Sequence, residues 1–78
     1  MVEQIIRILS EVKEDGGLTD SLTGGSSIID DVGLDSLQMI NFMLRIEEEF
    51  EIEIDFDNFD FENLSSINNF AAYISERK

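Results

Sequence analysis

Residues 35–50 read DSLQMINFMLRIEEEF, and this stretch sets the fold of the chain. Asp35 is a favoured N-cap residue, and Gln38 three positions later completes the pattern of a capping box. We therefore expect a helix that starts at Ser36 and runs to about Phe50. At about 100° per residue its apolar side chains gather on one face, with Ile40 at the edge, which predicts the side that packs on the core. These side chains are Met39, Phe42, Met43, Ile46 and Phe50.

A second line of side chains follows the opposite side of this predicted helix. It consists of Leu37, Asn41, Leu44 and Glu48, at positions i, i+4, i+7 and i+11. Two of these residues are leucines on the face that we expect to be exposed to solvent. Single apolar residues on a protein surface are common, so this can be an ordinary surface. A short apolar line bordered by acidic residues also suits a transient protein interface. The pattern alone is compatible with both interpretations.

The chain before this helix predicts one more helix and a long connection. The first helix is indicated by one apolar face, formed by Val2, Ile5, Ile6, Leu9 and Val12. We expect Asp15-Gly16-Gly17 to end it, because glycine accepts the left-handed conformation of a helix C-terminus. Residues 16–35 then form a connection of unusual length for a small domain. Its apolar residues predict that it is pinned to the core: Leu18, Leu22, Ile28, Ile29, Val32 and Leu34.

The chain after residue 50 predicts a loop and two further helices. Residues 51–56 alternate polar and apolar side chains, but no partner strand is evident, so we expect an extended loop. Residues 57–64 are expected to form a short third helix or a turn. Ser65 or Ser66 then caps a final helix, whose apolar face consists of Ile67, Phe70, Ala71 and Ile74. The expected fold is all-α, with three main helices, one short helix and a long first loop in a single domain, residues 1–78.

The composition excludes several kinds of site. The chain has no cysteine and no histidine, so it lacks disulfides, thiolate zinc sites and the usual general base. No arrangement of the remaining polar residues indicates catalysis, and we predict that the chain is not an enzyme. The acidic residues at 55, 57, 60 and 62 resemble a calcium loop, but an EF-hand needs an oxygen ligand, a glycine and a glutamate where Phe59, Asp60 and Ser66 stand. We therefore predict no metal site.

The formal net charge is −13, from 18 acidic and 5 basic side chains. Such a chain is repelled by nucleic acid and by anionic membrane surfaces, and it attracts proteins with basic patches. Acidity can also serve solubility alone. The N-terminal residues carry charges too often for a secretory signal, and no apolar stretch is long enough to span a bilayer. We expect a monomer in the cytoplasm that binds no nucleic acid and does not insert into membranes.

Ser36 is the one residue whose position indicates chemistry. A serine that follows an aspartate at a helix start usually does no more than contribute to capping. The first turn of a helix, however, offers unpaired N–H groups and the positive end of the dipole, which stabilise an attached phosphate. The long loop before Ser36 leaves its hydroxyl within reach of another enzyme. The site therefore suits a phosphodiester.

Three segments of the chain resemble the acyl carrier protein family. They are DVGLDSL at residues 31–37, IEEEF at residues 46–50, and Glu53-Ile54. The resemblance covers essentially the whole chain and implies a four-helix bundle. It implies that Ser36 carries 4′-phosphopantetheine, transferred from coenzyme A by a phosphopantetheinyl transferase. It also implies that the arm ends in a thiol that holds acyl or aminoacyl groups as thioesters, so the chain needs no cysteine of its own.

The resemblance gives roles to two further sets of residues. Partner enzymes of the family read the helix that follows the modified serine, so acyl-loading and acyl-processing enzymes with basic patches are expected to dock there. The expected docking residues are Asp35, Leu37, Asn41, Leu44, Glu47 and Glu48. Carriers of this kind can also shelter an acyl chain between their helices. The expected lining of such a pocket is Ile28, Met39, Met43, Ile46 and Phe50.

Several residues depart from the pattern of the fatty-acid carriers. Gln38 and Asn41 are neutral where acidic residues are expected, Arg45 adds a positive charge, and no proline follows Ile54. These departures favour a carrier of polyketide, nonribosomal peptide or other specialised biosynthesis over a fatty-acid carrier, and a D-alanyl carrier is a further alternative. The alternative from a different class is an unmodified acidic module that binds proteins through its distributed charge.

Overall fold

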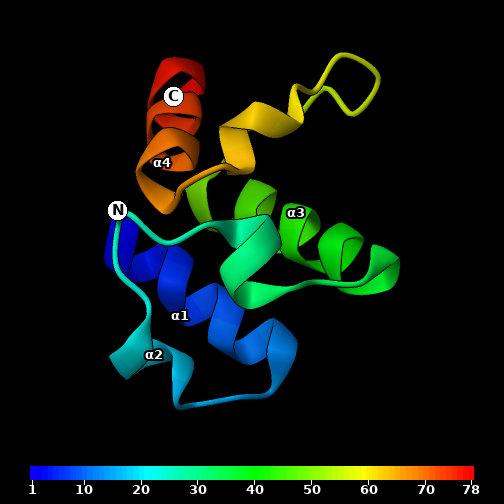
Figure 1. Cartoon of the computed structure of the whole chain (residues 1–78). Coiled ribbons are helices and arrows are strands. Elements are labelled where there is room, and N and C mark those ends of the chain that lie inside the picture. Colours follow the sequence, from blue (N-terminus) through cyan, green and yellow to red (C-terminus); the bar gives the residue numbers. More distant parts are fainter.

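The computed structural model describes residues 1–78 and is all-helical, as the sequence predicts. Three longer helices, α1 (Val2–Lys13), α3 (Ser36–Phe50) and α4 (Ile67–Arg77), are joined by connections that contain shorter ones. The shorter elements are α2 (Leu18–Ser21), the π-helix η1 (Ile28–Val32) and the 3-10 helix η2 (Phe61–Leu64). Helix α1 packs against α2, α3 and α4, and η2 packs against α4. Figure 1 shows α4 at the end of the molecule opposite to the start of α3.

The core is built from the apolar faces that the sequence predicts. Helix α3 contributes Phe42, Met43, Ile46 and Phe50, while Met39 is only half-buried and Ile40 is exposed. Phe42 of α3 lies against Phe70 of α4, with ring centroids 5.4 Å apart. The other fully buried side chains come from every remaining element except α2, and they are Ile5, Ile8, Leu9, Ile28, Leu64, Ile67 and Ile74. No helix of the chain is long and apolar enough to cross a bilayer.

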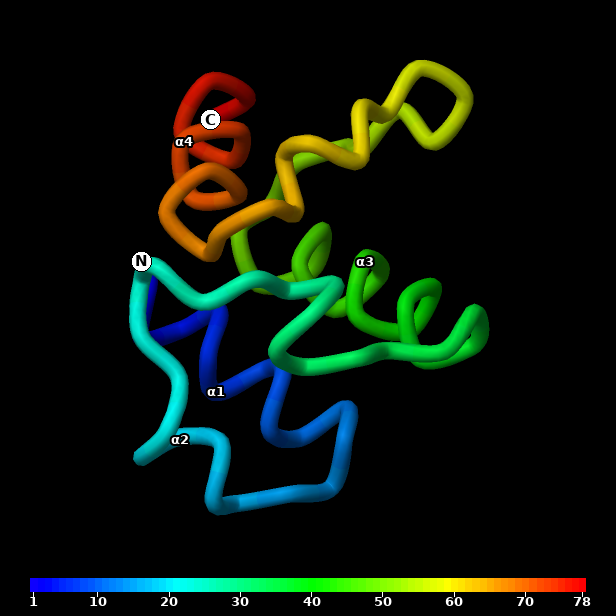
Figure 2. Tube along the Cα trace, viewed as in Figure 1, coloured from blue at the N-terminus to red at the C-terminus, as the bar shows by residue number.

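The long first connection differs from the sequence prediction in its structure. It contains α2 and η1, whereas no helix is predicted there. Its attachment to the core is confirmed, because Leu22, Ile28 and Val32 are buried. Ile29, which is predicted to take part, is instead 44% exposed. Two backbone hydrogen bonds also attach the connection to the start of α4. The Ile67 N–H donates to the Ser26 carbonyl at 2.9 Å, and the Asn68 N–H donates to the Gly24 carbonyl at 2.8 Å. The tube in Figure 2 shows this connection running back across the molecule before α3 begins.

The first helix does not end on the glycines that the sequence indicates. It ends at Glu14, which takes the left-handed conformation with φ 55°. The N–H groups of Glu14 and Asp15 donate to carbonyls of the last turn of α1 at 3.2 and 2.9 Å. The two glycines belong instead to the turn into α2, where the Gly17 N–H donates to the Asp15 carboxylate at 3.0 Å. The earlier end lets the chain turn so that Leu18 packs against the core.

The segment between α3 and α4 agrees with the prediction of an extended loop followed by a short helix. Residues 51–60 contain no regular element, and their yellow tip extends away from the body of the molecule in Figure 1. Ile52 and Ile54 of this loop are buried and anchor it to the core. The final helix is capped by Ser66, whose hydroxyl accepts the Asn69 N–H at 3.0 Å. Of the two serines that the sequence offers as the cap, Ser65 and Ser66, the structure therefore uses Ser66.

Gly33 provides a direct test of the backbone path that leads into α3. It has φ 70° and nothing within 4 Å of the position where a Cβ would stand. The Gly33→Ala variant should therefore lose about 1 kcal/mol of unfolding free energy in urea, for conformational reasons alone. Gly16→Ala is the matched control, because Gly16 is equally open and has no positive φ. Equal stability of the two variants would contradict the left-handed conformation of Gly33.

Candidate functional site

The start of α3 is fixed by two reciprocal hydrogen bonds. The Gln38 N–H donates to the Asp35 carboxylate at 2.7 Å, and the Asp35 N–H donates to the side-chain oxygen of Gln38 at 3.2 Å. This is the capping box that the sequence predicts. It leaves Ser36 as the first residue of a 15-residue helix. The N–H groups of Ser36 and Leu37 have no carbonyl partner within the helix, since the first four N–H groups of any α-helix lack one.

Ser36 is exposed, and its hydroxyl takes no part in the hydrogen bonds of the chain. The positive end of the α3 dipole lies at this residue, which favours a negative group bound there. The hydroxyl is therefore accessible from outside and placed where an attached phosphate is stabilised. These are the properties that a phosphodiester at Ser36 requires.

Lys13 brings a positive charge to the loop that precedes Ser36. Its ammonium donates to the Gly33 carbonyl at 3.3 Å, three residues before the serine. Lys13 does not stand out in the sequence, because a basic residue in the last turn of a helix is a common complement to the dipole. Only the path of the first connection places the end of α1 beside this loop. This contact holds a positive charge at the loop that leads into α3.

The structure brings together four of the six residues expected to dock partners. Leu37 and Leu44 are 69% and 48% exposed, and Asn41 and Glu48 are exposed on the same face of α3. Ile40, which the sequence analysis places at the edge of the core face, is 53% exposed and extends this apolar line. We call these five residues the α3 stripe. The α3 stripe is exposed because α3 packs on the core with its other face.

The other two expected docking residues have roles within the chain. The carboxylate of Asp35 is used in the capping box. Glu47 is half-buried, and its carboxylate accepts the Ile54 N–H at 2.8 Å. This bond ties the end of α3 to the loop that follows. Sequence spacing could not reveal it, because it depends on how the loop turns back along the helix.

The residues expected to line an acyl pocket are part of the close-packed core. Ile28, Met43, Ile46 and Phe50 are buried and Met39 is half-buried. The one hollow in the structure lies elsewhere, between α1 and α3 on the outside of the molecule. The acyl pocket therefore stays a prediction.

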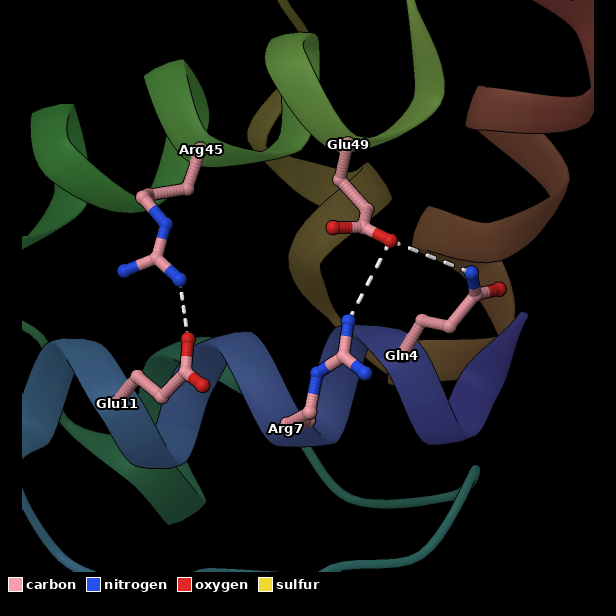
Figure 3. A network of polar contacts seen from close by, with 5 residues as sticks. All are labelled: Gln4, Arg7, Glu11, Arg45 and Glu49. Atoms are coloured by element: carbon pink, nitrogen blue, oxygen red, sulfur yellow. Dashed lines mark hydrogen bonds and ion pairs between the residues drawn. The ribbon is translucent and has the colours of Figure 1, made fainter.

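Two ion pairs join α1 to α3, as Figure 3 shows. Arg45, the positive charge on the docking helix, pairs with Glu11 of α1. Arg7 of α1 lies 3.4 Å from the carboxylate of Glu49, which also accepts a 3.5 Å hydrogen bond from Gln4. Arg45 is thus turned toward α1 and its charge is balanced within the chain.

The acidic residues of the loop after α3 form local hydrogen bonds. The Asn58 side chain donates to the Asp55 carboxylate at 2.8 Å, and this bond holds the pKa of Asp55 below its ordinary value. The Asp60 carboxylate accepts the Glu62 N–H and caps η2. No three acidic side chains converge where they could hold a metal ion.

Comparison with known proteins places this geometry in context. The sequence matches the family described as "Phosphopantetheine attachment site" over residues 3–74. It is 37% identical over 76 residues to the acyl carrier protein of Kineococcus radiotolerans, covering 95% of this chain and 91% of that protein. It is 34% identical over 58 residues to the acyl carrier protein of Bdellovibrio bacteriovorus, covering 74% and 72%.

The fold also matches a solved structure. The solution NMR structure of a holo acyl carrier protein from Nitrosomonas europaea superposes with a TM-score of 0.84. The match covers 96% of this chain and 92% of that one at 24% sequence identity. At this level of identity the likeness shows a shared fold.

The bond between Glu47 and Ile54 yields a test of how the loop is held. Glu47→Ala should lose about 1 kcal/mol of unfolding free energy in urea, the usual net value of one such hydrogen bond. Hydrogen exchange of the Ile54 amide should become faster in this variant. Glu48→Ala is the control, because the carboxylate of Glu48, the next residue, is exposed and accepts no such bond. If both variants are as stable as the wild type, Glu47 does not anchor the loop.

Proposed function

The chain belongs to the family of proteins that carry a phosphopantetheine attachment site, and we propose that the group is attached to Ser36. It is an acyl carrier protein with a phosphopantetheine prosthetic group, and as a carrier it is not an enzyme. The observation that supports Ser36 most strongly is its exposed hydroxyl at the first position of α3. The helix dipole lends further support, because it favours a phosphate there.

The residues of this chain present the serine and leave the chemistry of attachment to another enzyme. The Ser36 oxygen forms a bond to the phosphorus that carries pantetheine, the P–O bond of the diphosphate link of coenzyme A breaks, and adenosine 3′,5′-bisphosphate leaves while a base accepts the hydroxyl proton. Because the chain has no histidine, we assign the proton acceptor to the phosphopantetheinyl transferase. Once attached, the group supplies the thiol that the sequence lacks, and acyl or aminoacyl groups are carried on it as thioesters.

The α3 stripe is the proposed docking surface for the transferase and for the enzymes that load and process acyl groups. It lies on the helix that starts with Ser36, so a partner bound to it also reaches the serine. Its exposed apolar side chains offer contact area, and the acidic surroundings favour partners with basic patches. We expect the carrier to act as a monomer in the cytoplasm.

We favour a dedicated biosynthetic pathway over housekeeping fatty-acid synthesis. Support comes from Gln38, Asn41 and Arg45, which depart from the acidic pattern of fatty-acid carriers. In the structure Gln38 completes the capping box and Arg45 is paired with α1, so these residues have defined roles. Polyketide and nonribosomal peptide assembly are the proposed settings, and fatty-acid or D-alanyl carriage are the alternatives.

The attachment is tested by the mass of the intact protein. The apo chain is incubated with coenzyme A and a broad-specificity phosphopantetheinyl transferase, beside a known carrier as positive control. We expect the wild type to gain the mass of one phosphopantetheine and Ser36→Ala to gain none. Ser75→Ala, which removes an exposed serine on α4, should be modified like the wild type. An unmodified wild type beside a modified control carrier would favour the alternative of an unmodified acidic module.

The docking surface is tested by the KM of the same reaction. Leu37→Ala and Glu48→Lys should each raise the KM about fivefold, the effect of losing roughly 1 kcal/mol of contact. Phe61→Ala and Glu76→Lys are the controls away from α3. Phe61→Ala also truncates an exposed apolar side chain, and Glu76→Lys makes the same charge reversal as Glu48→Lys. Circular dichroism checks that all four variants keep their helices. If the α3 variants and the controls behave alike, the α3 stripe does not bind the transferase.

A further inference from the structure

The hollow between α1 and α3 is a groove of about 530 Å³ with an acidic lining. Three carboxylates line the groove: Glu11 in α1, Glu14 at the C-cap of α1, and Glu48 in α3. Leu44, which is 48% exposed, and Asn41 also line it, and both belong to the α3 stripe, as does Glu48. The groove is therefore continuous with the proposed docking surface, but it extends onto a second helix that the sequence analysis does not connect with docking.

The groove already holds one guanidinium group. Arg45 is part of its lining, and its guanidinium pairs with Glu11 across the groove. The side chains of Arg45 and Glu11 are 45% and 46% exposed, so solvent and other proteins can reach the pair. Glu14 and Glu48 take part in no ion pair. Three carboxylates thus face one cation, and the groove keeps a negative charge that a further basic side chain would balance.

The groove lies close enough to Ser36 for one enzyme to contact both. Its α3 residues follow the serine by five to twelve positions, which is about 8–18 Å along the helix axis. A standard interface covers about 800 Å² on each partner, so it spans such a distance. The enzyme in question must bind coenzyme A, whose phosphates are recognised by arginine and lysine. Its surface around the reacting serine is therefore expected to be basic.

We propose that the groove receives an arginine or lysine side chain of the phosphopantetheinyl transferase, and that Arg45 competes with this side chain for Glu11. The proposal rests on the proposed attachment of phosphopantetheine to Ser36. It makes α1 a second half of the docking site. It also makes Arg45 a residue that limits affinity for basic partners, because its charge must be displaced or tolerated when the partner's cation enters.

The second ion pair between α1 and α3 provides a matched control. Arg7 and Glu49 join the same two helices with the same charges (Figure 3). Neither residue lines the groove. Replacing the corresponding member of either pair changes the net charge equally and breaks one ion pair between the helices, although Glu49 also accepts a 3.5 Å hydrogen bond from Gln4. Only the Arg45–Glu11 pair changes what the groove presents to a partner. Exposed pairs of this kind contribute little to stability, so we expect all the variants to fold.

The experiment measures the KM of the wild type and of four variants with coenzyme A and a broad-specificity transferase at low ionic strength. Arg45→Gln should lower the KM about threefold, since Glu11 is then free for the partner, and Glu11→Gln should raise it about threefold. Arg7→Gln and Glu49→Gln should each stay within about 1.5-fold of the wild type. The shifts at the groove should shrink at high salt, because screening weakens exposed charge pairs.

Three results would overturn the proposal. Equal shifts in the two pairs would assign the effect to net charge alone. Shifts of the same sign in Arg45→Gln and Glu11→Gln would indicate that the pair only joins the helices, because both changes break the same contact. Unchanged KM values in both groove variants would show that the transferase does not use the groove. Failure of the wild type to be modified at all is a different outcome, since it contradicts the proposed attachment itself.

Discussion

The two reciprocal bonds between Asp35 and Gln38 are the constraint on which the rest of the structure depends. They fix the residue at which α3 begins, and from there the i, i+3 and i+4 spacing of a helix places the side chains on its two faces. With Ser36 first, Phe42 and Ile46 point into the core and Leu37 faces solvent. One local motif therefore places the exposed serine, the helix dipole behind it and the surface that a partner can read. A helix that began elsewhere would take Ser36 away from the first position and from the positive end of the dipole.

The strong negative charge is the second feature that links fold to function. A net charge of −13 in 78 residues destabilises a compact state through repulsion between like charges. Two of the five basic residues, Arg7 and Arg45, bridge α1 and α3, and Lys13 contacts the loop before Ser36. Arg77 and Lys78 lie over the rings of Tyr73 and Phe50. Most carboxylates are left without a cation, so a basic partner relieves repulsion when it binds, and this favours transient docking.

The sequence was most informative where structure depends on neighbouring residues. The bounds of α3, its capping box and its two faces follow from local rules, and so does the cap of α4 at Ser66. The end of α1 was mispredicted, because Glu14 takes a left-handed conformation that glutamate rarely adopts. The helices of the first connection, the bond from Glu47 to the loop and the position of Lys13 were not predicted. Each depends on contacts between segments that are distant in sequence or on the path of a loop, which periodicity does not encode.

The central claim is that the chain acts through one modified residue, Ser36, at the start of α3. It is tested most directly by tandem mass spectrometry of peptides from the chain after it has been produced together with a phosphopantetheinyl transferase. The account predicts phosphopantetheine on the single peptide that contains Ser36, with fragment ions that assign it to this residue. Attachment at any other serine, or several partly modified sites, would contradict it.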